Sequence, residues 1–288
     1  LAFINEAFRP ANSTAIAFYS KAENRTRSYA LNRLAINIGW ALGSSIGGVL
    51  ADIDYTLLFY VDGITNIAAA ILIWLFLKPV KVNEENEKQT APIKLMSAYK
   101  DKTYLLFIFL TIFFASCFFQ FFTNLSPFFY KELHFSETLI GFLLAINGVI
   151  IALVEMVLIY KLEGKGRDIQ YISLGIFMVG LSFFMLNIPG MGPILAFSTI
   201  TLLTFGEIFS MPFMNSFWIS RTQAGNRGQY AALYTMAWSA AQTLGPLGGS
   251  LLAGQFGFKW LWFSAGTVCI IVAFAVKKLR RTGHLPIK

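Results

Sequence analysis

The chain has 288 residues, of which 56% are hydrophobic and only 13% are charged. A soluble globular domain carries about 25% charged residues, so this composition leaves too little charge for a water-facing surface and excludes an ordinary soluble domain. The formal net charge is +8, but the basic residues are scattered over short segments, so no nucleic-acid partner is expected.

The apolar residues form long runs, and a helix of about 20 residues spans the roughly 30 Å hydrocarbon core of a bilayer. We therefore predict an all-α integral membrane protein with about nine transmembrane helices present. In chain order they cover residues 1–19, 30–51, 57–77, 104–129, 139–160, 171–187, 193–220, 229–253 and 260–276. Because Leu1 already lies inside the first run, we expect an amino-terminally truncated fragment.

The segments between the runs alternate in charge. Every second one is rich in Lys and Arg, whereas those between carry no base except Lys131 and Lys259. The positive-inside rule predicts that the basic segments are cytoplasmic. This places the polar segment Lys78–Lys102 and the tail Lys277–Lys288 in the cytoplasm, and predicts an integral protein of the plasma membrane, the inner membrane in a bacterium.

One pattern of small residues occurs twice. The stretch "ALGSSIGGVLAD" at 41–52 is similar to "TLGPLGGSLLAG" at 243–254, and the same offset pairs Glu6 with Glu207. Six runs separate equivalent helices, so the two copies cross the membrane in the same direction. Parallel repeats of this kind are found in secondary transporters.

These motifs carry a family resemblance. The chain resembles the major facilitator superfamily of secondary transporters. "LGPLGGSLLAG" is similar to the Gly-Pro-Gly-Gly helix motif of its antiporters, "EAFRPANSTAIA" resembles span four of its drug-efflux members, and "YKLEGKGRD" is similar to its loop motif. The last similarity implies a cytoplasmic gate loop with Glu163, Lys165 and Arg167.

The resemblance also implies a domain organisation. The nine runs would be spans four to twelve of twelve, in two parallel pseudo-repeats. Residues 1–77 would be the carboxy-terminal half of a truncated N-terminal six-helix bundle, and 78–103 a cytoplasmic central loop. Residues 104–276 would be the C-terminal six-helix bundle and 277–288 a cytoplasmic tail.

Ionisable residues at mid-depth are costly in a membrane and usually face a cavity or a partner. Glu6 and Arg9 are three residues apart on one helical face, and they form either a structural pair or a site where Arg9 holds an anionic substrate group. We favour Glu207 as the residue that couples proton movement to transport. Glu155 is expected to extend toward the cytoplasmic bases near Lys161.

The stretch "CFFQFFTNLSPFFY" in the fourth run predicts a wall of the substrate cavity. Gln120 and Asn124 are four apart on one stripe among phenylalanines, which suits amphipathic or apolar ligands; the alternative is that the aromatic rings face lipid. Asn147, Asn215 and Trp238 are further candidates for the cavity.

Small residues spaced by four allow helices to approach closely in lipid. The candidates for helix packing or gating are Gly39, Gly43, Gly47, Gly245, Pro246 and Gly249. In a rocking transporter these faces would let a helix of one half slide on the other half, and static packing is the alternative. Pro246 is expected to bend its helix.

The sequence contains no nucleophile–base pattern, no ATP-binding loop and no metal-ligand spacing. We therefore expect no enzyme activity, cofactor or metal site. The predicted function is secondary active transport of small organic solutes by alternating access, with proton-coupled export (an efflux antiporter) first. A proton-coupled importer of sugars, nucleosides or peptides and a non-transporting membrane sensor are the alternatives. The expected partners are a small-molecule substrate, protons and the bilayer, and a monomer is expected.

Overall fold

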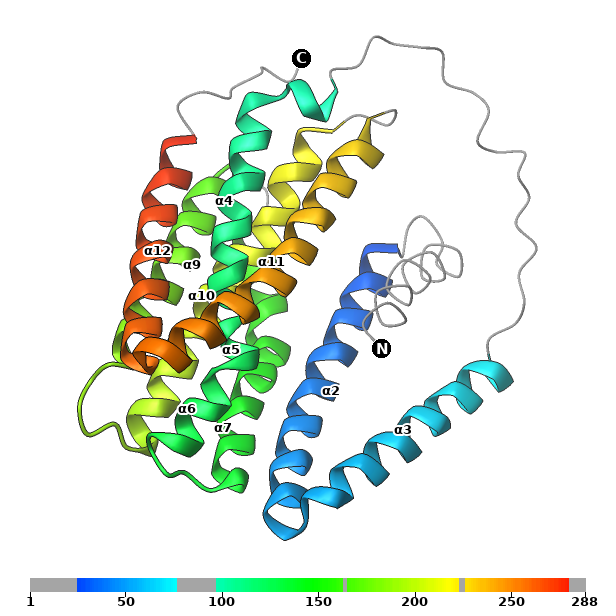
Figure 1. The fold of residues 1–288 in the computed structure, drawn as a ribbon. Coiled ribbons are helices and arrows are strands. Elements are labelled where there is room, and N and C mark those ends of the chain that lie inside the picture. The colour runs from blue at the N-terminus through cyan, green and yellow to red at the C-terminus, as the bar shows by residue number, and fades with distance from the viewer. Residues whose placement is uncertain (1–24, 77–96, 163–164, 223–225, 280–288) are drawn as a thin grey trace.

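The computed structural model describes residues 25–76, 97–162, 165–222 and 226–279, and within these ranges it contains helices and no strands. Within each of these ranges the long helices follow one another through short connections (Figure 1). They are α2 (Arg25–Ile53), α3 (Tyr55–Phe76), a 3₁₀ turn (Ala98–Lys100), α4 (Lys102–Phe118), α5 (Gln120–Thr123), α6 (Leu125–Lys131), α7 (Glu137–Ile150), a π-helical segment (Ile151–Glu155), α8 (Met156–Leu162), α9 (Asp168–Met185), α10 (Pro193–Ser220), α11 (Arg227–Phe256) and α12 (Phe258–Leu279).

Local signals account for several helix ends. The Asp101 carboxylate accepts a hydrogen bond from the backbone N–H of Tyr104 at the start of α4. The hydroxyl of Ser136 does the same for Leu139 in α7. Gly257 ends α11 with a φ of 88°, a left-handed conformation that an L side chain rarely adopts.

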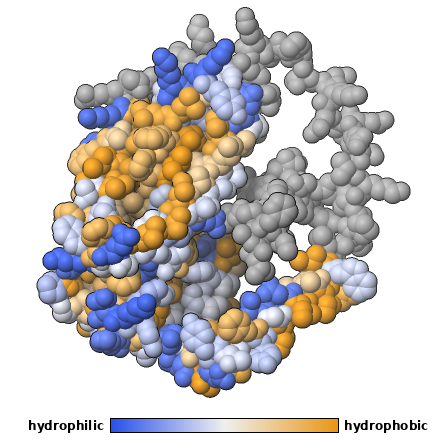
Figure 2. All heavy atoms as spheres, viewed as in Figure 1, coloured by the Kyte–Doolittle hydropathy of each residue, from blue (hydrophilic) through white to orange (hydrophobic). Residues whose placement is uncertain are grey.

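Seven helical segments are long and apolar enough to cross a membrane, which confirms the prediction of a polytopic all-α membrane protein. They are Leu34–Ile53, Tyr55–Phe76, Lys102–Thr123, Glu137–Leu162, Asp168–Met185, Pro193–Ser220 and Phe258–Leu279. Helix α11 has the length, 30 residues, but is richer in Gly, Gln, Ser and Thr. The first predicted run, 1–19, lies outside the described residues. Figure 2 shows apolar side chains spread over the outside of the bundle and along α3, as a lipid-facing surface requires.

Helices α4 to α12 pack into one bundle, and α2 joins it along α7. The bundle core is aromatic and aliphatic, with Tyr104, Phe114, Ile176, Phe213 and Trp262 all buried. Helix α3 contacts α2 and has no buried residue among those described. Figure 1 shows it diverging from the bundle.

The connections lie at two opposite ends of the bundle (Figure 1). We call the end with residues 97–101, 165–167 and 221–222 the basic end. The far end carries residues 53–54, 132–136, 186–192 and 257. Successive membrane-spanning segments therefore run in opposite directions, which is the arrangement that a membrane-spanning bundle needs.

The chain between Lys102 and Lys131 is interrupted twice. Helix α4 ends before Phe119 and α5 ends before Asn124, and α6 then continues through Pro127 near its start. A proline is tolerated in the first turn of a helix because that N–H would have no helical partner. The breaks thus fall before the proline, and Asn124 lies at the second of them.

Candidate functional site

Glu207 and Asn147 are brought together between α10 and α7. Glu207 lies in the middle part of α10, and its Oε2 accepts a hydrogen bond of 2.9 Å from the Asn147 amide nitrogen Nδ2. The same nitrogen donates to the Thr204 hydroxyl at 3.1 Å, and that hydroxyl donates to the carbonyl of Ile200. Asn147 is only 3% exposed. A carboxylate is thus held at mid-helix by a buried amide from a neighbouring helix.

This arrangement has a simple chemical consequence. An ionised carboxylate inside a membrane protein requires donors; it can accept a proton, and the neutral carboxyl can release that proton, as the surroundings change. The Asn147 amide nitrogen donates hydrogen bonds to Thr204 and to Glu207. It therefore orients the carboxylate without supplying a charge.

Gln120 and Asn124 form a second polar group, which ties α5 to α11. The Gln120 amide Nε2 donates to the carbonyls of Ser116 and Gly245, both at 2.8 Å. Asn124 Nδ2 donates to Gln120 Oε1 at 2.6 Å, and the Ser250 hydroxyl donates to Asn124 Oδ1 at 3.4 Å. Both amides are buried, and their hydrogen bonds join helices of one bundle rather than point to an open space.

The small residues of α11 make room for this group. A Cβ added at Gly249 would contact Gln120 Oε1 and lie 2.5 Å from Gln120 Cδ, and one at Gly245 would lie 2.7 Å from the carbonyl oxygen of Ser116. Among the described residues this face packs inside the α4–α12 bundle, as the static-packing alternative has it, and sliding on the other half stays a prediction. Helix α11 continues through Pro246.

The close approach of α2 to the bundle uses another face than the one predicted. Among the described residues, a Cβ at Gly39 or Gly43 meets no heavy atom within 4 Å, and one at Gly47 meets Leu58 of α3 at 3.7 Å. The face of α2 that packs against α7 is instead the one that carries Gly48. There a Cβ would lie 2.9 Å from the Cα of Gly141.

The α2–α7 contact contains a second close point. A Cβ added at Gly148 would lie 2.5 Å from the carbonyl oxygen of Asn37 and 3.0 Å from the Cβ of Ala41. Ala41 and Gly48 are seven residues apart, as are Gly141 and Gly148, and seven residues make about two helical turns. Gly141 and Gly148 were not among the residues predicted from the sequence, although this matching spacing could have revealed them.

The remaining cavity candidates lie on α10 and α11. The Trp218 indole N–H donates to Asn215 Oδ1 at 3.2 Å, and Asn215 is exposed. The ring of Trp238 lies 6.0 Å from that of Phe119 at the break after α4. The structure thus places Trp238 beside the predicted aromatic wall, and Asn215 nearer the basic end.

Three of the predicted residues, Glu6, Arg9 and Glu163, lie outside the described residues. Lys165 and Arg167 are exposed and precede α9 at the basic end.

Glu155 was expected to extend toward Lys161, but it is only 3% exposed. Glu155 belongs to the π-helical segment between α7 and α8, where the chain departs from regular α-helical geometry.

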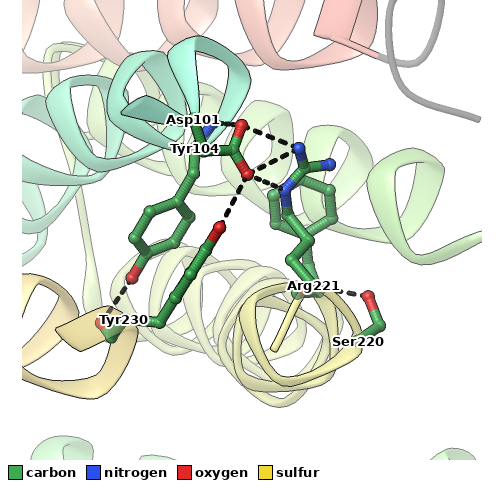
Figure 3. Close-up of polar contacts among 6 residues, drawn as sticks. Asp101, Tyr104, Ser220, Arg221 and Tyr230 are labelled. Atoms are coloured by element: carbon green, nitrogen blue, oxygen red, sulfur yellow. Dashed lines mark hydrogen bonds and ion pairs between the residues drawn. The ribbon is translucent and has the colours of Figure 1, made fainter. Parts of the chain in front are cut away.

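A buried ion pair, absent from the sequence predictions, closes the basic end of the bundle (Figure 3). Arg221 Nε donates to Asp101 Oδ2 at 2.9 Å and Nη2 donates to Oδ1 at 2.8 Å, with Asp101 only 4% exposed. The Tyr230 hydroxyl donates to Asp101 at 3.1 Å, and the Tyr104 hydroxyl donates to the carbonyl of Tyr230 at 2.6 Å. The group fastens α4, α10 and α11 together.

The seven long apolar helices define an integral membrane protein of the polytopic α-helical class. The family model described as Major Facilitator Superfamily matches residues 1–246. The chain therefore belongs to the major facilitator superfamily.

Two curated relatives carry related names. The "Uncharacterized MFS-type transporter YttB" of Bacillus subtilis is 20% identical over 250 residues, which are 85% of this chain and 62% of the relative. The "Uncharacterized MFS-type transporter MJ1560" of Methanocaldococcus jannaschii is 24% identical over 249 residues, 83% of this chain and 62% of the relative. The chain thus spans less than two thirds of the length of these relatives.

Solved structures show the same fold at low identity. A POT family transporter in complex with 5-aminolevulinic acid has a TM-score of 0.74 at 15% identity, covering 93% of this chain and 72% of that one. A POT family transporter in complex with a thioalcohol-conjugated peptide has a TM-score of 0.76 at 15% identity, covering 95% and 73%. At this identity the likeness concerns the fold.

Proposed function

We propose that the protein is a proton-coupled secondary transporter that exports small organic solutes by alternating access, with Glu207 as the proton-carrying residue. The observation that carries the proposal is the hydrogen bond from Asn147 Nδ2 to the Glu207 carboxylate, between two helices that could each span the bilayer. Membership of the major facilitator superfamily supports transport as the activity.

The coupling follows from the exchange of partners at one carboxylate. When the pathway is open to one side, Glu207 is ionised and holds a cationic or polar ligand group, with Asn147 as a second, neutral partner. When the pathway is open to the other side, a proton replaces the ligand. The two species then cannot occupy the carboxylate together, and the movement of one drives the other.

The orientation of the bundle in the membrane comes from the charge distribution. The basic end of the bundle is assigned to the cytoplasm by the positive-inside rule, and the far end to the outside of the plasma membrane. Ligands would enter among the aromatic rings of Phe119 and Trp238, whose centroids lie 6.0 Å apart at the break between α4 and α5. Apolar, amphipathic solutes suit such surroundings.

The test uses the protein expressed from its full reading frame and reconstituted in proteoliposomes with a pH-sensitive dye in the lumen. The probes are tetraphenylphosphonium, an organic cation, and an uncharged sugar, a nucleoside and a dipeptide. The dipeptide is included because one structural neighbour was solved with a peptide conjugate. We expect the organic cation to trigger a proton flux that Glu207→Gln abolishes.

The matched control is Glu132→Gln, which removes an exposed carboxyl at the far end and should leave the proton flux unchanged. Exchange of labelled probe for unlabelled probe reports binding and rocking without net proton movement. Glu207→Gln should weaken this exchange for the organic cation, because it removes the carboxylate that holds the cationic group, whereas Glu132→Gln should retain it. Proton flux that survives in Glu207→Gln would refute Glu207 as the proton carrier. A response only to the dipeptide or sugar, moving inward, would establish the importer instead, and no response from folded protein would favour a sensor.

A further inference from the structure

Asp52 makes a contact that reaches from α2 to the start of α7. Its Oδ1 accepts the backbone N–H of Glu137 at 3.0 Å, and its Oδ2 accepts the backbone N–H of Thr138 at 2.9 Å. The Thr138 hydroxyl also donates to Oδ2. Asp52 lies in the last turn of α2, and Glu137 and Thr138 are the first two residues of α7. One carboxylate thus bridges two helices through three hydrogen bonds.

The chemistry of a helix start explains why a carboxylate occupies this place. The first N–H groups of a helix have no partner inside it, and they attract a negative charge. Ser136 satisfies Leu139 within α7 itself, whereas Glu137 and Thr138 depend on Asp52. The cap of α7 is therefore shared between its own loop and a different helix.

The bridge lies directly beyond a close approach of the two helices. Gly48 is four residues before Asp52 and hence on the same face of α2. A Cβ at Gly48 would lie 2.6 Å from the carbonyl oxygen of Glu137 and 2.9 Å from the Cα of Gly141. Backbone thus touches backbone next to the bridge, so α2 and α7 are closed against each other at the far end.

We propose that Asp52 is a gating residue of the transport pathway, whose bridge to the start of α7 holds the far end shut. The inference rests on the proposed function, because alternating access requires this end to open. Opening separates α2 from α7 and breaks all three hydrogen bonds together. Asp52 is solvent-exposed. When the bridge breaks, water can therefore hydrogen-bond both to the carboxylate and to the N–H groups of α7, which makes the contact reversible.

Asp54 provides a matched comparison. It lies two residues further along the chain and is also exposed, but its carboxylate accepts from the backbone of Thr56, in the same turn. Removing either carboxylate changes the charge of the far end equally. Only the loss of Asp52 removes a bridge between α2 and α7.

The experiment measures the opening of the far end directly. Spin labels are placed at Ile53 on α2 and Tyr130 on α6, which are 70% and 54% exposed, in full-length protein with Cys117 and Cys269 replaced by serine. Electron–electron distance measurements in nanodiscs then give the populations with the far end closed and open. We expect Asp52→Ala to raise the open-to-closed ratio by about tenfold or more, because charge-assisted hydrogen bonds are lost.

The variants are expected to form a series. Asp52→Asn keeps one acceptor oxygen and should lie between Asp52→Ala and the wild type, while Asp54→Asn should match the wild type. Thr138→Val removes only the hydroxyl donor and serves as a milder variant if Asp52→Ala fails to fold. An unchanged distance distribution in Asp52→Ala, or in Thr138→Val if that variant has to be used, would overturn the gating role, as would an equal shift in Asp54→Asn.

This readout is independent of the transport assay. If the ratio shifts as expected but no probe moves protons, the gate stands and the proposed function fails. If substrate-driven proton flux is found but the ratio does not shift, the function stands and the gate fails.

Discussion

Replacing Gly249 with alanine is expected to disrupt the polar group that joins α5 to α11. The new Cβ would contact Gln120 Oε1 and lie 2.5 Å from its Cδ and 2.8 Å from its Nε2, so the Gln120 side chain must leave its position. That movement breaks the bonds from Nε2 to Ser116 and Gly245 and the bond that Oε1 accepts from Asn124. The site is buried, with Gln120 only 4% exposed.

The magnitude follows from these three hydrogen bonds. Side-chain hydrogen bonds between membrane helices contribute about 0.6 kcal/mol on average and ordinary ones about 1 kcal/mol, so the loss is about 2–3 kcal/mol. Alanine also raises helix stability by about 0.5–1 kcal/mol relative to glycine. Gly248→Ala shares that gain and its Cβ meets nothing within 4 Å. The difference between the two variants is therefore about 2–3 kcal/mol.

The assay uses the two cysteines of the chain. Cys117 and Cys269 are both buried, so a maleimide dye reacts with them only as the protein unfolds. At roughly 2–4 °C per kcal/mol, the Tm of Gly249→Ala should lie about 4–12 °C below that of Gly248→Ala. In a protein that already carries Gln120→Ala, the further change Gly249→Ala should lower the Tm little, because the side chain that the methyl group would meet is gone. Equal Tm values for the two glycine variants would refute the reasoning.

Two further outcomes follow from the contacts. Arg221→Gln should lower stability by about 2–4 kcal/mol in the same dye assay, because it leaves Asp101 buried without its cation; exposed Lys100→Gln is the control, and equal Tm values would contradict the pairing. Gly48→Ala should slow probe transport by about tenfold or more, because its methyl group would meet the α7 backbone. Gly39→Ala, with nothing within 4 Å, should transport normally, and a similar loss in both would show that the contact is not specific.

Several features could be read from the sequence because they depend on neighbouring residues. The membrane class and most spans follow from runs of apolar side chains, and the family motifs lie within single helices. Glu207 was selected as an ionisable residue at mid-depth and Asn147 as a further candidate for the cavity, and the structure pairs them at 2.9 Å. Their pairing was not predicted, because it depends on how α10 is rotated against α7.

Other assignments needed the tertiary structure. Gln120 and Asn124 were selected as ligand-facing, but their hydrogen bonds run to α11 and to each other. Asp101 and Arg221 belong to different helices, far apart in the sequence, so no local spacing connects them. In α2, glycines occur on more than one face, and sequence alone favoured the face with Gly39 and Gly43 over the one with Gly48.

By itself the sequence determined that this chain is a bundle of membrane-spanning helices, because entry into a bilayer depends on about 20 consecutive residues at a time. Only the tertiary structure decided which helix faces meet. It also decided that Asp52 of α2 caps the start of α7, and that the Gln120 amide hydrogen-bonds to α11. The physical reason is that lipid is as apolar as the side chains it touches, so helix contacts depend on close packing and hydrogen bonds between segments. Those contacts are fixed by rotation and register, which no single helix encodes.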